Sequence, residues 1–181
     1  MTSIPPQSHR MCWTGYPAGT AEPIAALLAK LQPNAMAFQG PGNNVIRWVG
    51  TEDGHAPYPT WSTAQSSWDA GAGDPNAPVW VPAESDTCLQ TDCAAARSRN
   101  MTGGESGKDA APYSGCWFYN PDMCPKSRTE LISTYHDTVG HNSYLLLDWT
   151  PTPAGDLRPD HIAAYQVCLP WCLSHRAYKR R

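Results

Sequence analysis

EPIAALLAKLQPNAMAF, residues 22–38, decides the fold class of this chain. Apolar residues recur over 22–31 at the spacing of a one-sided helix, and Thr20 is a suitable N-cap. Pro33 disfavours helical conformation in the residue before it, so the helix is predicted to end at residue 31. Residues 35–38 then form a short apolar run typical of a buried strand. A helix followed by a short link and a buried strand indicates an α/β unit, whose strands belong to parallel sheets.

The rest of the chain continues this alternation of helices and strands, with long loops between them. Apolar runs and helix-stop residues predict strands over 45–49, 79–84 and 144–148, and helices over 125–139 and 157–167. Polar, Gly-rich or Pro-rich sequence predicts loops over the rest of 43–68 and over 69–78 and 87–113. Long loops in α/β barrels carry the functional site.

Length and charge limit the function. The 181 residues are enough for one domain but fewer than the roughly 250 of a complete (β/α)8 barrel. The net charge of −3 gives no electrostatic basis for binding nucleic acid, and the single basic run, 179–181, is expected to be a solvated tail. No apolar stretch is long enough to span a membrane, and residues 1–10 lack the apolar core of a secretory signal.

The cysteines favour an oxidising compartment. Cys88 and Cys93, and Cys116 and Cys124, are closely spaced in loop-like sequence, and the glycosylation sequon at Asn100 lies between the two groups. We therefore take these four cysteines as disulfide candidates, without a pairing. The rival interpretation, a zinc site, lacks both a CxxC motif and a histidine at a supporting spacing. We expect no metal and no cofactor.

Two glutamates are candidates for acid–base chemistry. Glu52 lies among turn-forming residues close to Trp48, and Glu84 is predicted to end the strand over 79–84. A carboxyl group beside indole rings is poorly solvated, which suits it to protonating a leaving oxygen. Taken alone, each is equally compatible with a surface or structural carboxylate. The eight Trp and eight Tyr, against two Phe, suit stacking on sugars or the covering of half-buried surface.

Short motifs rich in aromatic, proline and carboxylate residues follow one another along the chain: 31–35, 40–44, 45–54 (VIRWVGTEDG), 80–86 (WVPAESD), 115–119, 125–127, Tyr135, 139–143 and 145–148. In this order they resemble the motifs of the α-L-fucosidases of glycoside hydrolase family 29. The resemblance covers roughly Gly15 to Tyr165. It implies an α/β fold that is the second half of a (β/α)8 TIM barrel with long βα loops.

The resemblance also implies roles for the candidate residues. Glu52 matches the general acid/base of one branch of the family, and Glu84 matches a carboxylate of the same pocket, so we rank Glu52 first. Trp48, Trp61 and Trp117 are expected to stack on sugar or to wall the cleft, with core packing as the alternative. We expect Arg47 to contact substrate hydroxyls or to pair with Asp53.

One departure concerns the nucleophile. In the family an Asp comes shortly before a Gly-Tyr-Pro segment like that at Gly15, and counting back two residues places Trp13 there. Tryptophan cannot form a glycosyl-enzyme ester, so one of the two carboxyl groups of the retaining mechanism is missing. We expect a non-homologous leader at 1–14, a fucosidase-like half-barrel at 15–167 and an aberrant tail at 168–181. This pattern suggests a fragment of the family's catalytic domain. Two explanations stay open, a truncated gene model and a true pseudoenzyme.

Three hypotheses follow. The first is an α-L-fucosidase whose parent enzyme hydrolyses terminal α-L-fucose from glycans with retention, this chain itself being inactive. The second is a non-catalytic carbohydrate-binding remnant or pseudoenzyme. The third, a disulfide-stapled interaction module, does not account for the ordered motifs. The expected partner is a fucosylated oligosaccharide or glycoconjugate, and the expected location of the parent is extracellular, lysosomal or vacuolar.

Overall fold

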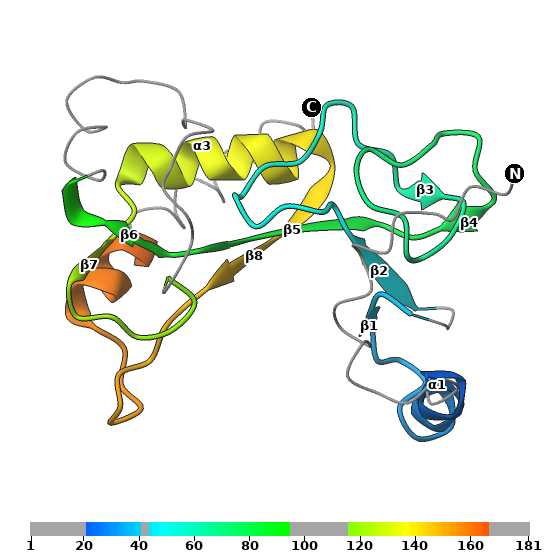
Figure 1. Cartoon of the computed structure of the whole chain (residues 1–181), viewed down its shortest axis with the longest axis horizontal. Helices are drawn as coiled ribbons and strands as arrows, with labels where there is room; N and C mark the ends of the chain where they lie inside the picture. The colour runs from blue at the N-terminus through cyan, green and yellow to red at the C-terminus, as the bar shows by residue number, and fades with distance from the viewer. Residues whose placement is uncertain (1–20, 41–43, 95–115, 167–181) are drawn as a thin grey trace, which may run out of the picture. The chain divides into compact units, whose positions relative to one another are not determined.

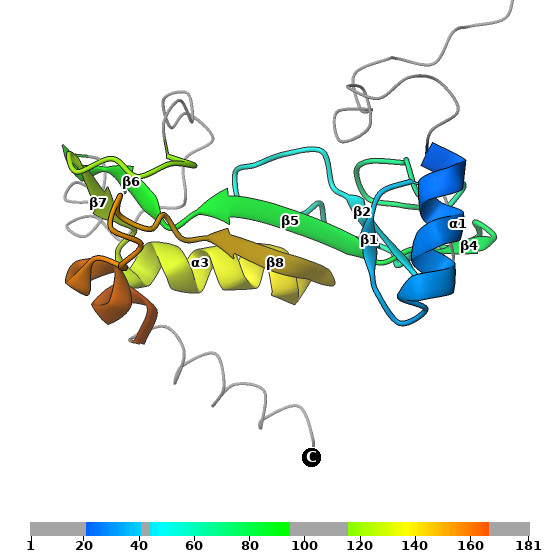
Figure 2. The same ribbon diagram turned by 90° about the horizontal axis from the view of Figure 1, so that it is seen from below.

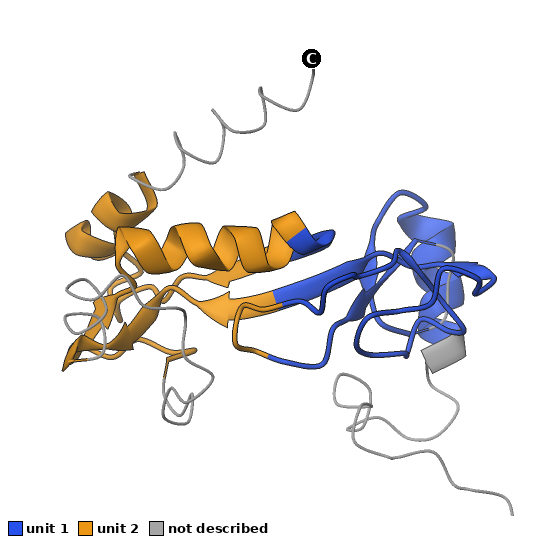
Figure 3. Cartoon of the chain, turned by 90° about the horizontal axis from the view of Figure 1, so that it is seen from above, with its two compact units in different colours: residues 1–51, 56–85, 141–144 blue, residues 52–55, 86–140, 145–181 orange. Residues whose placement is uncertain are grey.

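The structure, a computed structural model, describes residues 21–40, 44–94 and 116–166, which fall into two compact units. Figure 3 colours the units, whose members are as follows: unit 1, residues up to Thr51, Ala56–Ser85 and His141–Tyr144; unit 2, Glu52–His55, Asp86–Gly140 and residues from Leu145 onward. In the described part of the chain no helix is long and apolar enough to cross a membrane. The described residues also contain no cluster of three or more His, Cys, Asp or Glu that could hold a metal ion.

Unit 1 contains the helix and strand of the opening segment. Its elements, labelled in Figure 1, are α1 (Ala21–Leu31), β1 (Ala37–Phe38), β2 (Val45–Trp48), β3 (Thr63–Ala64) and β4 (Val79–Trp80). The predicted helix and the next two strands are confirmed, and β1 pairs with β2 in the parallel sense expected of an α/β unit. In the antiparallel β3–β4 pair, β4 falls within the predicted strand over 79–84, whereas β3 lies in sequence expected to be loop and was marked by no apolar run.

The core of unit 1 is made of small aliphatic side chains. Val45, Ala64 and Val81 form one buried cluster. A second cluster contains Val49 and two alanines, at positions 56 and 83. Helix α1, which lies beside β1 and β2 in Figures 1 and 2, adds little to this core. Its apolar stripe is exposed among the described residues, as Leu27, Leu28 and Leu31 are 55%, 41% and 62% exposed.

Strands β5 (Ala83–Cys88) and β8 (Ser143–Asp148) contain residues of both units, and the strand order of their sheet is β1-β2-β5-β8. The predicted strand over 144–148 is confirmed. The prediction of one strand over 79–84 is wrong, because β4 ends at Trp80 and β5 starts at Ala83. Between them the chain exchanges its pairing with β3 for parallel pairing with β2, and Pro82 has no N–H to extend a ladder.

Unit 2 is built around a capped helix and a small antiparallel pair. Its further elements are β6 (Gln90–Asp92), β7 (Met123–Pro125), α3 (Arg128–Thr138) and a helix over 159–166. The 3-10 turn η2 (Val139–His141) begins in unit 2, and its last residue belongs to unit 1. The helix predicted over 125–139 begins later than expected. The residues up to Pro125 belong to β7, and Ser127 forms a capping box with Glu130 at the start of α3. Strands β6 and β7 were not predicted.

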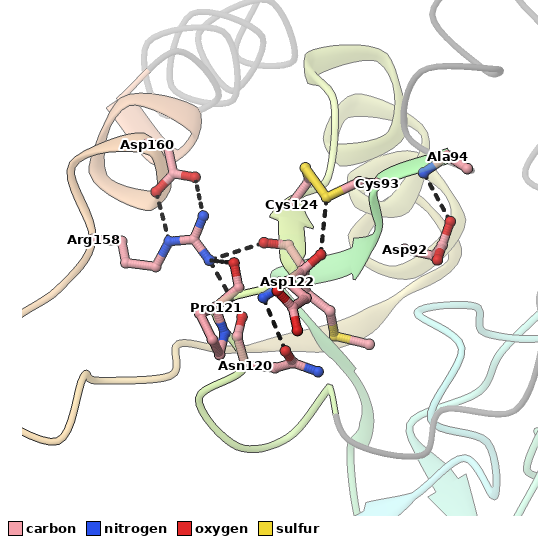
Figure 4. Close-up of a disulfide and its surroundings, with 10 residues drawn as sticks. Asp92, Cys93, Ala94, Asn120, Pro121, Asp122, Cys124, Arg158 and Asp160 are labelled. Carbon is pink, nitrogen blue, oxygen red and sulfur yellow. Dashed lines mark hydrogen bonds and ion pairs between the residues drawn. A yellow bond between two sulfur atoms is a disulfide. The ribbon is translucent and has the colours of Figure 1, made fainter.

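The four cysteine candidates form two disulfides in unit 2. Cys88 is joined to Cys116 and Cys93 to Cys124, so each bridge links the two cysteine groups instead of closing within one. Figure 4 shows the second bridge, whose Cys124 lies in β7. The two bridges therefore tie β5 and the end of β6 to the segment that begins at residue 116.

Arg158 connects strand β7 to the helix over 159–166. The guanidinium of Arg158 donates to the carbonyl of Met123 (2.9 Å). It also forms an ion pair with Asp160 (2.6 Å), which Figure 4 shows. Burial disfavours the charged form of Asp160, but the hydrogen bond and charge of Arg158 and the charge of His161 together lower the pKa of that carboxyl. Arg158 thus fixes the β7 end of unit 2.

Candidate functional site

Glu52 and Trp117, both predicted site residues, are brought together in unit 2. The indole Nε1 of Trp117 donates to Oε2 of Glu52 over 3.2 Å, although 65 residues separate them in the chain. Both side chains are half-buried. An indole N–H can only donate, so this contact fixes one carboxylate oxygen and orients the carboxyl group.

The turn that carries Glu52 is held by a glycine. Gly54 is buried with φ +71°, and its N–H donates to the carbonyl of Asp86 (3.1 Å). A Cβ on Gly54 would lie 2.9 Å from Cγ2 of Thr87 in β5 and 3.0 Å from Cγ2 of Thr134 in α3. Only glycine therefore allows the turn to pack this closely on the strand and the helix.

The backbone around Trp117 is held by a disulfide and by a buried amide. Cys116, directly before it, is 4% exposed and bonded to Cys88 of β5. The amide of Gln90 in β6 also bonds the backbone on either side of Trp117. Sequence reasoning missed Gln90, because a glutamine within a polar stretch gives no signal of a partner 26 residues away.

Glu84 and Trp48 lie in unit 1, next to each other on paired strands. Trp48 of β2 is in register with Glu84 of β5, and both are half-buried. Glu84 was expected at a strand end, and this is wrong, since it is the second residue of β5. Its predicted role as an acid/base stays a prediction.

Arg47 is fully buried in unit 1 and holds a loop. Its terminal nitrogens donate to the carbonyls of Gly71 (2.6 Å) and Trp61 (2.8 Å). Burial lowers the pKa of Arg47, and the charge of Asp69 acts in the opposite direction. Both of these hydrogen bonds are with protein backbone, so Arg47 has a structural role in unit 1. Its expected contact with substrate stays a prediction.

Trp61 lies in an exposed aromatic segment of unit 1. It is 42% exposed, and Tyr58 nearby in sequence is 80% exposed with its ring 5.1 Å from that of His141. Asn142 donates to the carbonyl of Thr60 (2.9 Å), which anchors this segment. Exposed rings on an anchored backbone suit stacking on a ligand.

Asp148, at the end of β8 in unit 2, is a carboxyl group that the sequence analysis did not single out. Its Oδ2 is buried and has no hydrogen-bond partner among the described residues. Burial raises the pKa of Asp148. A signal was present in the sequence, since Asp148 directly follows the apolar run 145–147. Trp13 and the sequon at Asn100 lie outside the described residues.

No family model matches the chain, but individual proteins do. A protein of Oryza sativa subsp. japonica provisionally named alpha-L-fucosidase 1 is 27% identical over 150 residues, 78% of this chain. Alpha-L-fucosidase 1 of Arabidopsis thaliana is 27% identical over 140 residues, 72% of this chain. The chain spans about a quarter of these relatives, 24% and 22% of their lengths.

The fold matches as well. A crystal structure of a glycoside hydrolase 29 family member from an unknown rumen bacterium superposes with a TM-score of 0.58 at 26% identity. The match covers 79% of this chain and 23% of that one. The parallel strand pairs seen in unit 1 are those expected of an α/β barrel. Over this part of its length the chain is related to the α-L-fucosidases of glycoside hydrolase family 29, and its α/β fold is part of their TIM barrel.

Proposed function

We propose that this chain carries the acid/base element of a retaining α-L-fucosidase, with Glu52 as the proton donor and acceptor. The observation that supports it is the hydrogen bond from Trp117 Nε1 to Glu52 Oε2. The relatives carry the name α-L-fucosidase, and the motif around Glu52 resembles the family's acid/base motif. The proposed substrates are fucosylated oligosaccharides or glycoconjugates.

The acid/base residue of a retaining glycosidase acts in two successive steps. In a retaining glycosidase, the acid first protonates the leaving oxygen and then, as a carboxylate, takes a proton from the attacking water. Its carboxyl group must therefore stay in one orientation through both steps. The indole bond to Oε2 does this, and leaves Oε1 as the oxygen that transfers the proton.

The second carboxyl group that hydrolysis needs is not assigned in the chain. Trp13 stands where the resemblance places the nucleophile, so we propose that hydrolysis belongs to the parent enzyme and that this chain alone does not turn over. The alternative is a non-catalytic carbohydrate-binding protein. The exposed aromatic side chains of Tyr58, Trp61 and Trp80 in unit 1 favour it.

The test measures hydrolysis and binding on the full chain. We expect no release of 4-nitrophenol from 4-nitrophenyl α-L-fucoside, and binding of methyl α-L-fucoside that weakens in Glu52→Gln and Trp117→Phe. Asp156→Asn, which removes an exposed carboxylate of the same unit, is the matched control and should bind as the wild type does. Turnover abolished by Glu52→Gln would show that the chain is itself an enzyme. Binding unaffected by Glu52→Gln would refute the role of Glu52.

We propose an extracellular, lysosomal or vacuolar location for the parent enzyme. The two disulfides of unit 2 support it, because such bonds persist in oxidising compartments.

A further inference from the structure

Gln90 is a buried amide with hydrogen bonds at both of its ends. It is 2% exposed and lies at the first position of β6. Its Nε2 donates to the carbonyls of Cys116 (2.8 Å) and Phe118 (2.6 Å), and its Oε1 accepts from Thr150 Oγ1 (3.3 Å). Both hydrogens of the amide nitrogen are therefore used, as is a lone pair of its oxygen.

The two carbonyls that Gln90 binds are those on either side of Trp117. The Cys116 carbonyl belongs to the peptide unit entering Trp117, and the Phe118 carbonyl follows the peptide unit leaving it. Holding both restricts the backbone dihedrals of Trp117, and the backbone sets the direction of the side chain. The disulfide at Cys116 ties one point of the chain but does not by itself fix the rotation of the next residue.

The amide is itself mounted on a rigid element. Gln90 pairs with Pro125 in the β6–β7 ladder, and the backbone N–H of Lys126 donates to the carbonyl of Leu89 (2.8 Å). Binding both the Cys116 and the Phe118 carbonyl requires a side chain of this length that ends in a nitrogen with two hydrogens to donate. Glutamate has the same shape but no donor when ionised, and methionine has the same length but no donor at all.

We propose that Gln90 is a positioning residue, which orients the Trp117 indole toward Glu52 by holding the carbonyls of Cys116 and Phe118. The role of Glu52 as acid/base rests on the proposed function, but the Gln90–Trp117–Glu52 connection does not. Gln90 is buried, and its side-chain hydrogen bonds are with Cys116, Phe118 and Thr150. It acts through Trp117, whose indole N–H reports on the connection directly.

The test follows the indole N–H of Trp117 by NMR on the full chain, with the resonance assigned by its loss in Trp117→Phe. In Gln90→Glu and Gln90→Met we expect this resonance to shift and its exchange with solvent to become about tenfold faster, the factor for one lost hydrogen bond. Gln166→Glu makes the same chemical change at an exposed position of unit 2 and should leave the resonance in place. An unmoved resonance in a folded Gln90→Met chain would overturn the proposal.

Two further variants separate positioning from general destabilisation. Ser127→Ala removes the α3 capping bond and should lower Tm without moving the Trp117 resonance. Thr150→Val removes only the partner of Gln90 Oε1 and should produce a smaller shift in the same direction as Gln90→Glu. If both Gln90 variants fail to fold, Thr150→Val decides, and an unchanged indole resonance there overturns the proposal. None of these measurements involves sugar binding. The Gln90 proposal can therefore be tested even if the proposed function proves wrong.

Discussion

The two units hold comparable loops by different means. In unit 1 the buried guanidinium of Arg47 binds two backbone carbonyls, and the core around it consists of valine and alanine side chains. In unit 2 two disulfides and the buried amide of Gln90 hold the segment that begins at residue 116. Unit 1 therefore depends on polar contacts that need a folded surrounding, whereas unit 2 has covalent links that persist in the unfolded chain.

The difference bears on where each candidate group sits. Glu52 and Trp117 belong to the covalently linked unit, where a small loss of orientation would separate them. The exposed aromatic residues Tyr58 and Trp61 belong to the unit without a disulfide among its described residues. Proton transfer requires a fixed geometry, while stacking on a sugar tolerates adjustment. The more constrained unit thus carries the group with the stricter requirement.

The largest expected effect comes from breaking the covalent link nearest Trp117. The Cys88–Cys116 bridge closes a separation of 28 residues, for which the loss of loop-closure entropy predicts about 3 to 4 kcal/mol of stability. We expect the double variant Cys88→Ala with Cys116→Ala to increase amide hydrogen exchange in α3 and β6 far more than in β2. The measurement is residue-resolved exchange by NMR.

The converse variant is the control for that result. Arg47→Met removes both donors to the Gly71 and Trp61 carbonyls and should speed exchange in the loops of unit 1 while sparing α3. Equal acceleration in both units by either variant would mean that the units unfold together, and the comparison between them would fail.

A matched pair of glycines gives the next largest effect. Gly54 in unit 2 and Gly71 in unit 1 have nearly the same φ, +71° and +74°, so alanine meets the same backbone strain at both. A Cβ at Gly71 has nothing within 4 Å, whereas at Gly54 it would press on Thr87 and Thr134. We expect Gly54→Ala to cost about 1 to 3 kcal/mol more than Gly71→Ala, the usual range for overpacking.

Urea denaturation of the two variants measures this difference, and the Trp117 indole resonance shows where it arises. The turn at Gly54 carries Glu52, so Gly54→Ala should also move that resonance, and Gly71→Ala should not. Equal destabilisation by the two variants would show that the packing of the Glu52 turn against β5 and α3 is looser than the structure indicates.

The sequence predicted the elements that have a local signal. Pro33 marks the end of α1, and the leucine run before Asp148 marks β8. Strands β6 and β7 have only three residues each and no apolar alternation, and their pairing forms across a long intervening segment. Their existence follows from tertiary contacts, including the Cys93–Cys124 bridge, which no local pattern encodes.

The candidate site was predicted in the same partial way. The motif resemblance selected Glu52 and Trp117 without indicating that they touch. The apolar run over 79–83 predicted a strand that ends at Glu84, although Pro82 interrupts that run. The role of Gln90 could not be predicted from the sequence, since it depends on which backbone carbonyls lie within hydrogen-bond distance of the folded side chain.

The smallest expected effect is a dependence of stability on pH that originates in unit 2. Burial raises the pKa of Asp148 above its ordinary 3.8, so the folded chain keeps this proton at pH values where the unfolded chain has lost it. Below 3.8 the carboxyl group is protonated in both states and costs nothing. As the pH rises through 3.8 toward the folded-state pKa, stability falls, and above that pKa the loss stays constant.

Asp148→Asn removes this titration and keeps the size and shape of the side chain. We expect the variant to be more stable than the wild type at neutral pH, by less than about 1 kcal/mol because the group is only half-buried, and the gain to vanish at acidic pH. The measurement is the difference in unfolding free energy between variant and wild type as a function of pH, with exposed Asp156→Asn as the charge-matched control. Asp148 belongs to unit 2, so the gain should appear in the exchange of α3 and not of β2. A gain that is independent of pH, or one shared by β2, would place its origin outside the Asp148 carboxyl group.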